Sequence, residues 1–311
     1  MHIASTHVHM MGTVIEVQVE AERAQSLIDE AIRRLRIYEH RFSANDPASE
    51  LGELNSAAGR RPVEVHPELF ELISLGIENS LAPKSMLNIA IGPLVQLWRI
   101  GFADANVPDP AAIDAALQLT DPALIELDAE SGQVFLARSG MKIDLGAVAK
   151  GYIADLIIAY FKDQGAHSAM INLGGNVLTF GPSPRQSDGH WRIGLRHPNN
   201  ENDQIIGAIT VGEQSVVTSG VYQRRLNKDG RTYHHILDPA TGYPLETDVV
   251  SLTIVSPRSV DGEIWTSRLF GRSASEILLE ISTQPECSAL VITEDLELYA
   301  SGELREQLAF S

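Results

Sequence analysis

The feature that most constrains the fold is the stretch Asp144-Leu-Gly-Ala-Val-Ala-Lys-Gly-Tyr-Ile-Ala-Asp155. Before it, residues 133–138 and 141–143 alternate apolar and polar side chains, which predicts two short strands joined by a Ser-Gly turn. After it, apolar residues recur at helical spacing, at Ala147, Ile153, Leu156, Ile157 and Tyr160. We therefore predict a strand-to-helix turn that begins at Asp144. The free backbone N–H groups of such a helix start favour anions, although Asp144 by itself is equally typical of the cap of an ordinary helix.

The rest of the chain favours an α+β fold. Strands dominate the second half in hairpin-like pairs, and helices come mainly as single insertions, which is not a regular βαβ array. Helices are predicted over 21–38, 67–81, 261–269 and 275–281, a strand interrupted at Met11-Gly-Thr13 over 7–19, and a surface loop over 182–203. We expect one domain over residues 1–311, with mixed or antiparallel sheets and packed helices.

Composition excludes several classes of function. The chain has 24 lysines and arginines against 41 aspartates and glutamates, a net charge of −17 that argues against nucleic acid as a partner. The single cysteine, Cys287, rules out a disulfide framework or a cysteine metal site. No apolar run is long enough to span a membrane, and the N-terminal residues resemble neither a signal peptide nor a lipid-anchor motif. The expectation is a cytoplasmic protein, with a trimmed exported form left open.

Common cofactor motifs are also missing from the sequence. There is no G-x-G-x-x-G after a strand, no phosphate loop and no helical His-x-x-x-His pair. The remaining candidates are oxygen ligands of the kind that suits Mg²⁺, namely Asp144, Asp238, Asp261 and Glu263, with Thr266 and Ser267 nearby. Within Asp-Pro-Ala-Thr-Gly, Asp238 is better explained as a turn former than as a catalytic group.

Seven motifs give the chain a resemblance to a known family. They are Met11-Gly-Thr13; Phe42-Ser43 with Ser49-Glu-Leu51 and Leu54-Asn55; Ile91-Gly-Pro-Leu-Val-x-Leu-Trp98; Asp144 to Tyr152; Asn172-Leu-Gly-Gly-Asn176; Thr218-Ser-Gly-Val-Tyr222; and His235-Ile-Leu-Asp-Pro-Ala-Thr-Gly242. In this order they resemble the ApbE-type FAD:protein FMN transferases over roughly residues 7–300.

The resemblance implies a flavin transferase domain with an FAD cleft and Mg²⁺ at the diphosphate. Such enzymes move FMN from FAD onto a Thr or Ser hydroxyl of an acceptor flavoprotein and release AMP. By position, FAD would be lined by Met11, Asn45, Met86, Leu87, Asn88, Asp144, Lys150 and Ile236, with Gly174 and Gly175 as a further place where the ligand can approach the backbone. The metal would be held by the Ala147 carbonyl, Glu263 and Ser267, with Thr266 adjacent, and His235 would be the base.

These residue types suit the chemistry. Cleavage of a diphosphate needs charge neutralisation at phosphorus, which a metal supplies, and a histidine suits proton removal from a hydroxyl. Each residue also has a structural alternative. His235 is also explained as a structural histidine before a turn, Lys150 as a solvated helix residue, and Gly174 and Gly175 as backbone geometry alone.

The sequence departs from the family pattern at four places. Glu263 and Ser267 stand where Asp and Thr are usual, and Leu87-Asn88 replaces Phe-Asp. Asn45 stands where an aromatic residue is frequent, and Trp265 and Arg268 replace smaller residues. We interpret the chain as a divergent member. Two alternatives to FMN transfer stay open, an FAD pyrophosphatase that yields FMN and AMP, and a non-catalytic FAD-binding protein whose metal site has decayed.

Overall fold

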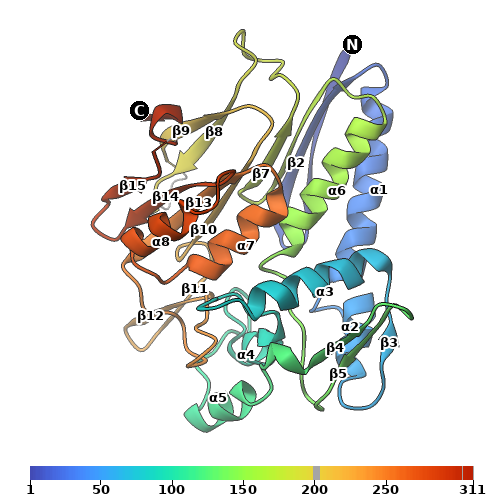
Figure 1. The fold of residues 1–311 in the computed structure, drawn as a ribbon, viewed down its shortest axis with the longest axis vertical. Coiled ribbons are helices and arrows are strands. Elements are labelled where there is room, and N and C mark those ends of the chain that lie inside the picture. The colour runs from blue at the N-terminus through green and yellow to red at the C-terminus, as the bar shows by residue number, and fades with distance from the viewer. Residues whose placement is uncertain (199–203, 303, 311) are drawn as a thin grey trace.

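The computed structural model describes residues 1–198, 204–302 and 304–310, and it has the predicted α+β fold (Figure 1). Within this part of the chain, the largest sheet has eight strands in the order β1-β2-β6-β7-β10-β13-β14-β15. All neighbouring strands in it are antiparallel. The strands are β1 (His2–Met10), β2 (Thr13–Ala21), β6 (Ser168–Leu173), β7 (Asn176–Phe180), β10 (Ser215–Gly220), β13 (Val249–Ser256), β14 (Ser288–Thr293) and β15 (Leu298–Ala300).

The interruption predicted at Met11-Gly-Thr13 is a two-residue hairpin turn between β1 and β2. The register runs from His2 opposite Ala21 to Met10 opposite Thr13. Met11 and Gly12 have φ angles of 54° and 70°, and positive φ at both central residues is what a type I′ hairpin requires. The turn therefore holds Met11 at the end of the sheet near β6 and β7.

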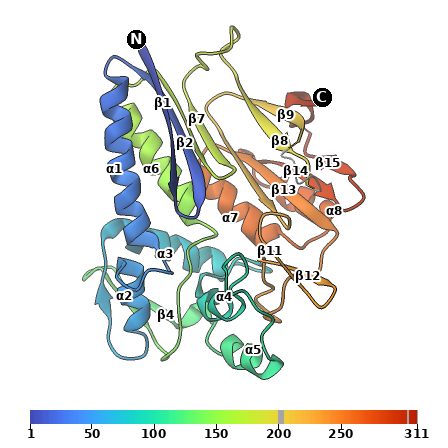
Figure 2. The ribbon, with the colours of Figure 1, turned by 180° about the vertical axis from the view of Figure 1, so that it is seen from behind.

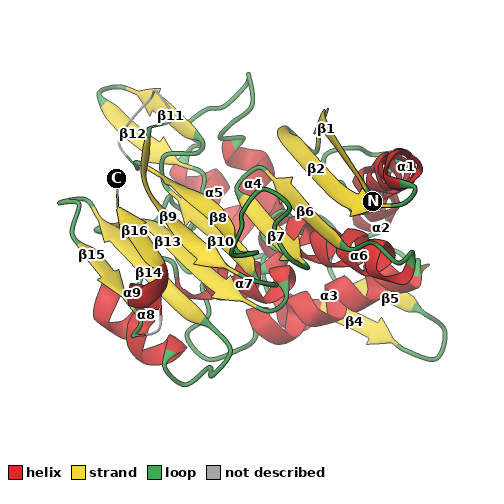
Figure 3. Cartoon of the chain, turned by 90° about the horizontal axis from the view of Figure 1, so that it is seen from above, coloured by secondary structure: helices red, strands yellow, loops and turns green. Residues whose placement is uncertain are grey.

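Helices cover one face of the large sheet, as Figure 3 shows from above. They are α1 (Ala24–Phe42), α6 (Ala149–Asp163), α7 (Ser259–Leu269) and α8 (Ala274–Ile281). α1 packs on β1 and β2, α6 on β6 and β7, α7 on β10 and β13, and α8 on β14. The inward side chains of β2, Ile15, Val17 and Val19, are fully buried under this layer. This alternation is what a half-buried strand needs.

A smaller sheet covers part of the opposite face. It consists of β8 (Trp191–Arg196), β9 (Ile205–Val211) and β16 (Leu308–Phe310), in the order β16-β9-β8. Trp191 and Ile209 of this sheet pack in one cluster with Val216, Val255 and Leu290 of the large sheet. Covered on both faces, β13 is buried at all of its residues, including the polar Ser251, Thr253 and Ser256.

The segment between α1 and α6 forms the lower part of the molecule in Figures 1 and 2. Its elements are α2 (Glu50–Ser56), β3 (Val63–Glu64), α3 (Pro67–Ser80), η1 (Ile89–Ile91), α4 (Gly92–Trp98), α5 (Pro110–Leu117), η2 (Pro122–Leu124), β4 (Ile125–Asp128) and β5 (Gln133–Leu136). Trp98 is 1% exposed, and its indole N–H donates to the Gly242 carbonyl at 2.8 Å. This contact joins the segment to the turn that follows the hairpin of β11 (Arg225–Lys228) and β12 (Arg231–His234).

One element was predicted wrongly. Residues 141–143 do not form a strand, because a side chain from α2 takes the place of a neighbouring strand. The Asn55 amide accepts from Ile143 N at 2.7 Å and donates to Ile143 O at 2.9 Å. Asp144 N donates to Ile89 O at 2.8 Å. Both polar backbone groups of Ile143 are thus satisfied without a ladder.

The four predicted helices correspond to α1, α3, α7 and α8. Of the loop predicted over 182–203, residues 199–203 lie outside the described residues, and β8 occupies 191–196. No helix in the described ranges is long and apolar enough to cross a bilayer. That residues 1–311 form one domain stays a prediction, consistent with a sheet that runs from His2 to Ala300. The short helix α9 (Leu304–Gln307) follows that sheet.

Candidate active site

The turn before α6 is built around the carboxylate of Asp144. Its Oδ1 accepts a hydrogen bond from Gly146 N at 2.8 Å, so Asp144 shapes the turn rather than capping the helix, which begins at Ala149. Burial raises the pKa of Asp144, while the Gly146 N–H and the charges of Lys150 and Arg224 act in the opposite direction. The predicted strand-to-helix turn is therefore a loop that the Asp144 carboxylate stabilises and that leads into a helix.

Two contacts bring α7 against the start of α6. Asp155 of α6 accepts hydrogen bonds from Ser259 N and Val260 N, at 2.8 and 2.9 Å, and thereby satisfies free N–H groups at the start of α7. Gly151 permits the close approach, because a Cβ there would lie 2.5 Å from Ser259 O. The helices could not pack this way with any larger residue at that position.

The contact between α6 and α7 places Glu263 beside the turn that precedes α6. Glu263 is 4% exposed, and its Oε2 accepts from Gly151 N at 2.8 Å. Its Oε1 lies 3.4 Å from the ammonium of Lys150, which also donates to Gly146 O at 3.1 Å. A buried carboxylate needs such partners, because an unpaired charge in the interior is costly.

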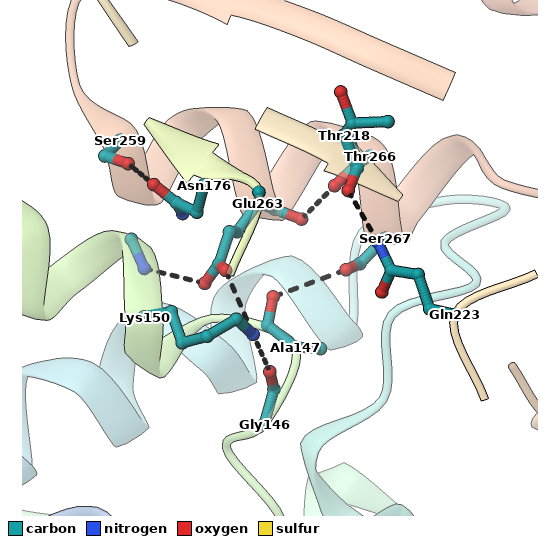
Figure 4. A network of polar contacts seen from close by, with 12 residues as sticks. Gly146, Ala147, Lys150, Asn176, Thr218, Gln223, Ser259, Glu263, Thr266 and Ser267 are labelled. Atoms are coloured by element: carbon teal, nitrogen blue, oxygen red, sulfur yellow. Dashed lines mark hydrogen bonds and ion pairs between the residues drawn. The ribbon is translucent and has the colours of Figure 1, made fainter. Parts of the chain in front are cut away.

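Ser267 comes from the next turn of α7. Its hydroxyl donates to the Ala147 carbonyl at 3.4 Å. Figure 4 shows Ala147, Lys150, Glu263 and Ser267 pointing toward one another from α7, the turn before α6 and the first turn of α6. The Thr266 hydroxyl instead donates to the Glu263 carbonyl at 3.1 Å, within its own helix. That contact favours a structural role for Thr266, and its predicted place beside a metal stays a prediction.

The oxygen atoms of this group are compatible with Mg²⁺. The ion prefers oxygen ligands at 2.0–2.1 Å in an octahedron, so adjacent ligands lie about 2.9 Å apart. The 3.4 Å between Ser267 Oγ and Ala147 O is close to that separation. Among the residues that the structure describes, no group of three or more His, Cys, Asp or Glu side chains is placed to hold a metal. A site here would thus rely on one carboxylate, a carbonyl and a hydroxyl.

His235 follows β12 and lies within the electrostatic reach of this group. Burial, the charge of Arg224 and, more weakly, the charge of Lys150 lower the pKa of His235 to about 4. Its Nδ1 is buried with no hydrogen-bond partner in the described chain. The adjacent His234 is used differently, because its Nε2 lies 2.8 Å from Leu245 O and its Nδ1 accepts from Ile236 N. His235 is therefore the histidine of this pair that keeps a free ring nitrogen.

Several residues predicted to line FAD have clear structural contacts. Leu87 is 3% exposed in the main core, and Asn88 caps η1 by accepting from Ala90 N at 2.8 Å and donating to Thr120 O at 2.8 Å. Met86 N donates to Arg268 O at 3.1 Å, which ties this loop to α7. Asn45 is exposed in the loop before α2. These contacts explain the local backbone, and FAD binding by these residues stays a prediction.

Two further predictions concern turns. Gly174 has φ of 66°, and a Cβ there would lie 2.2 Å from Thr13 Oγ1, so this glycine is required by the packing of two loops. Gly175 has φ of 98° and open space around it. Asp238 accepts from Ala240 N at 2.8 Å, as expected of a turn former.

Sequence reasoning missed two residues of this region. In the sequence Asp155 only ends a motif, and no periodicity or motif indicates that its side chain reaches α7. Arg224 was not singled out at all, although its charge acts on both Asp144 and His235.

Comparison with known proteins identifies the family of the chain. The model of the ApbE family matches residues 11–291. An FAD:protein FMN transferase of Klebsiella pneumoniae is 40% identical over 95% of this chain and 91% of its own length. A Treponema pallidum protein of the same name is 34% identical over 96% and 87%.

Solved structures give the same result for the fold. The crystal structure of the ApbE protein from Thermotoga maritima superposes with a TM-score of 0.89 at 26% identity, covering 98% of this chain and 99% of that one. The flavin transferase ApbE from Vibrio cholerae has a TM-score of 0.83 at 23% identity over 98% and 100%, and shows the fold alone. The family model, the relatives and the fold together establish that this chain belongs to the ApbE family.

Proposed function

We propose that the chain transfers FMN from FAD to a Ser or Thr hydroxyl of an acceptor flavoprotein domain and releases AMP, in a Mg²⁺-dependent reaction. The names of the Klebsiella and Treponema relatives, which are similar over most of their length, support transfer of FMN from FAD to protein. The observation that carries the proposal is the convergence of Ala147, Glu263 and Ser267 at the turn before α6. This group brings together α7 and the turn before α6, which are more than 100 residues apart in the sequence.

The metal site follows from that group of oxygens. Ala147, Glu263 and Ser267 would hold the ion, which when bound neutralises charge on the diphosphate. Lys150 adds a fixed positive charge beside the same carboxylate, at 3.4 Å. In a chain of net charge −17, a dianionic diphosphate requires local positive charge, which the bound ion would supply together with Lys150.

His235 would accept the proton in the transfer step. As the acceptor oxygen attacks the phosphorus of the FMN half, its proton passes to a ring nitrogen of His235. The bond from that phosphorus to the bridging oxygen breaks, and AMP leaves with that oxygen and its electron pair. With a pKa of about 4, the imidazole is unprotonated at neutral pH and has a lone pair available.

The test follows AMP and FMN by chromatography after incubation of the purified protein with FAD, with Mg²⁺ or EDTA, and with or without an acceptor domain. Metal-dependent AMP release together with flavin bound covalently to the acceptor is the expected result. AMP and free FMN without an acceptor would indicate a pyrophosphatase. FAD bound but uncleaved with metal and acceptor present would indicate a binding protein.

A further inference from the structure

Arg224 extends across the site from the segment between β10 and β11. Its side chain lies against two glycines far from it in sequence. A Cβ at Gly101 would lie 2.6 Å from Arg224 Cδ, and a Cβ at Gly12 would lie 3.6 Å from Arg224 Nη2. The stem therefore passes over the loop that follows α4, and the guanidinium reaches the β1–β2 turn beside Met11.

Arg224 also lies next to His235, whose backbone N donates to the Arg224 carbonyl at 3.3 Å. Burial raises the pKa of Asp144 and lowers that of His235, and the positive charge of Arg224 opposes the first shift and adds to the second, so it lies within electrostatic reach of both groups. Lys150 acts on the same two groups. The two cations therefore act on the same pair of groups, Asp144 and His235.

The guanidinium of Arg224 has no polar partner among the described residues. Its side chain is exposed and makes no hydrogen bond or ion pair within the described residues. The neighbouring Arg225, by contrast, donates to Val221 O at 3.2 Å, and Lys150 is paired with Glu263. All five N–H donors of Arg224 are thus available to a ligand.

We propose that Arg224 binds the diphosphate of FAD through its guanidinium, an inference that rests on the proposed function. The diphosphate is the anionic part of FAD, and the planar guanidinium fork matches phosphate oxygens in a bidentate manner. Lys150 is already paired with Glu263 and hydrogen-bonded to Gly146 O, whereas the guanidinium of Arg224 has no such partner among the described residues. In the same position it stabilises the charge that develops on the leaving AMP.

Binding of FAD, ADP and riboflavin, measured calorimetrically in EDTA for wild type, Arg224→Gln and Arg224→Lys, tests this assignment. ADP carries the diphosphate without the flavin, and riboflavin carries the flavin without phosphate. Loss of a charged hydrogen bond predicts about 10- to 100-fold weaker binding of FAD and ADP by Arg224→Gln, with riboflavin unchanged. Arg224→Lys should recover part of the loss, because it restores charge without the fork.

Arg231→Gln is the matched control. Arg231 is exposed at the far end of the β11–β12 hairpin, so its variant changes the net charge equally and should bind all three ligands as wild type does. Equal losses for riboflavin and ADP, or wild-type binding of ADP by Arg224→Gln, would overturn the assignment.

Two further measurements separate the inference from the function. Thermal melting of the Gln and Lys variants shows whether either has lost its fold. AMP release by the wild type tests the proposed function separately. A wild type that neither binds nor cleaves FAD would contradict both the proposed function and the assignment of Arg224. A wild type that cleaves FAD, with ADP binding unchanged in Arg224→Gln, would contradict the assignment of Arg224 alone.

Discussion

Asp155 Oδ1 accepts a hydrogen bond from Ser259 N at 2.8 Å, across 104 residues of sequence, and so fixes the start of α7 to the middle of α6. Its Oδ2 does the same for Val260 N at 2.9 Å. Because α7 carries Glu263 and Ser267 while α6 follows Ala147, this one side chain sets the relative position of the predicted metal ligands. Asp155 is a positioning residue rather than a group that touches substrate.

Replacement of Asp155 by Ala should destabilise the fold. It leaves two backbone N–H groups without their acceptor, and loss of a helix cap or of a buried hydrogen bond typically costs about 1–3 kcal/mol. Urea unfolding of Asp155→Ala would measure this against Asp163→Ala, an exposed residue at the end of the same helix. Equal midpoints for the two variants would contradict the role of the cap.

Titration of Asp155 should reduce stability as pH rises. Burial outweighs the two N–H groups and raises its pKa from 3.8 to about 6. The folded state therefore binds the proton more tightly than the unfolded state, and the contribution is favourable below about pH 4 and is lost as pH rises through about 6. Asp155→Asn should flatten this part of the stability profile in urea titrations between pH 4 and 7. An unchanged slope would show that Asp155 does not titrate there.

The sequence was informative wherever one local pattern decides the structure. The Met11-Gly-Thr13 interruption is a hairpin turn, and the apolar spacing located α1 and α3. In the site, Ser267 lies beside Ala147, two residues that the resemblance to the family groups at a metal, and their binding of a metal stays a prediction. Patterns of this kind are local and repeat along the chain.

Contacts between distant side chains could not be predicted in this way. The alternation of residues 141–143 indicated a strand, but Asn55 satisfies the backbone of Ile143 instead. Arg224 follows an ordinary turn, and its place in the site depends on Gly12 and Gly101, which precede it by more than 100 residues. No spacing along the chain indicates that Arg224 lies beside these two glycines.

Removal of the Glu263 carboxylate should abolish AMP release while the protein still folds. Glu263→Ala deletes the one carboxylate of the proposed metal site, and we expect at least about a hundredfold loss of turnover, since metal-ion stabilisation is worth several kcal/mol. Glu263→Gln keeps an oxygen that can accept from Gly151 N and separates loss of charge from loss of packing. Glu286→Gln, an exposed residue, is the control for net charge. Unchanged AMP release by Glu263→Ala would remove Glu263 from the site.

Replacement of His235 by Ala should leave FAD binding intact and reduce turnover by about 10²- to 10⁴-fold, the usual range for a general base. His190→Ala, a surface histidine, should behave as wild type in both measurements. Wild-type turnover in His235→Ala would exclude the role of base.

His235→Ala also tests a second prediction, which concerns the pH dependence of stability. Burial and the charge of Arg224 lower the pKa of His235 from 6.5 to about 4, so the unfolded state binds the proton more tightly. The contribution of His235 to stability is therefore fully present above about pH 6.5 and is lost as pH falls through about 4. This dependence is opposite in sign to that of Asp155. His235→Ala should remove it from urea titrations between pH 4 and 7, and a wild-type profile in that variant would place the His235 imidazole in solvent rather than in the site.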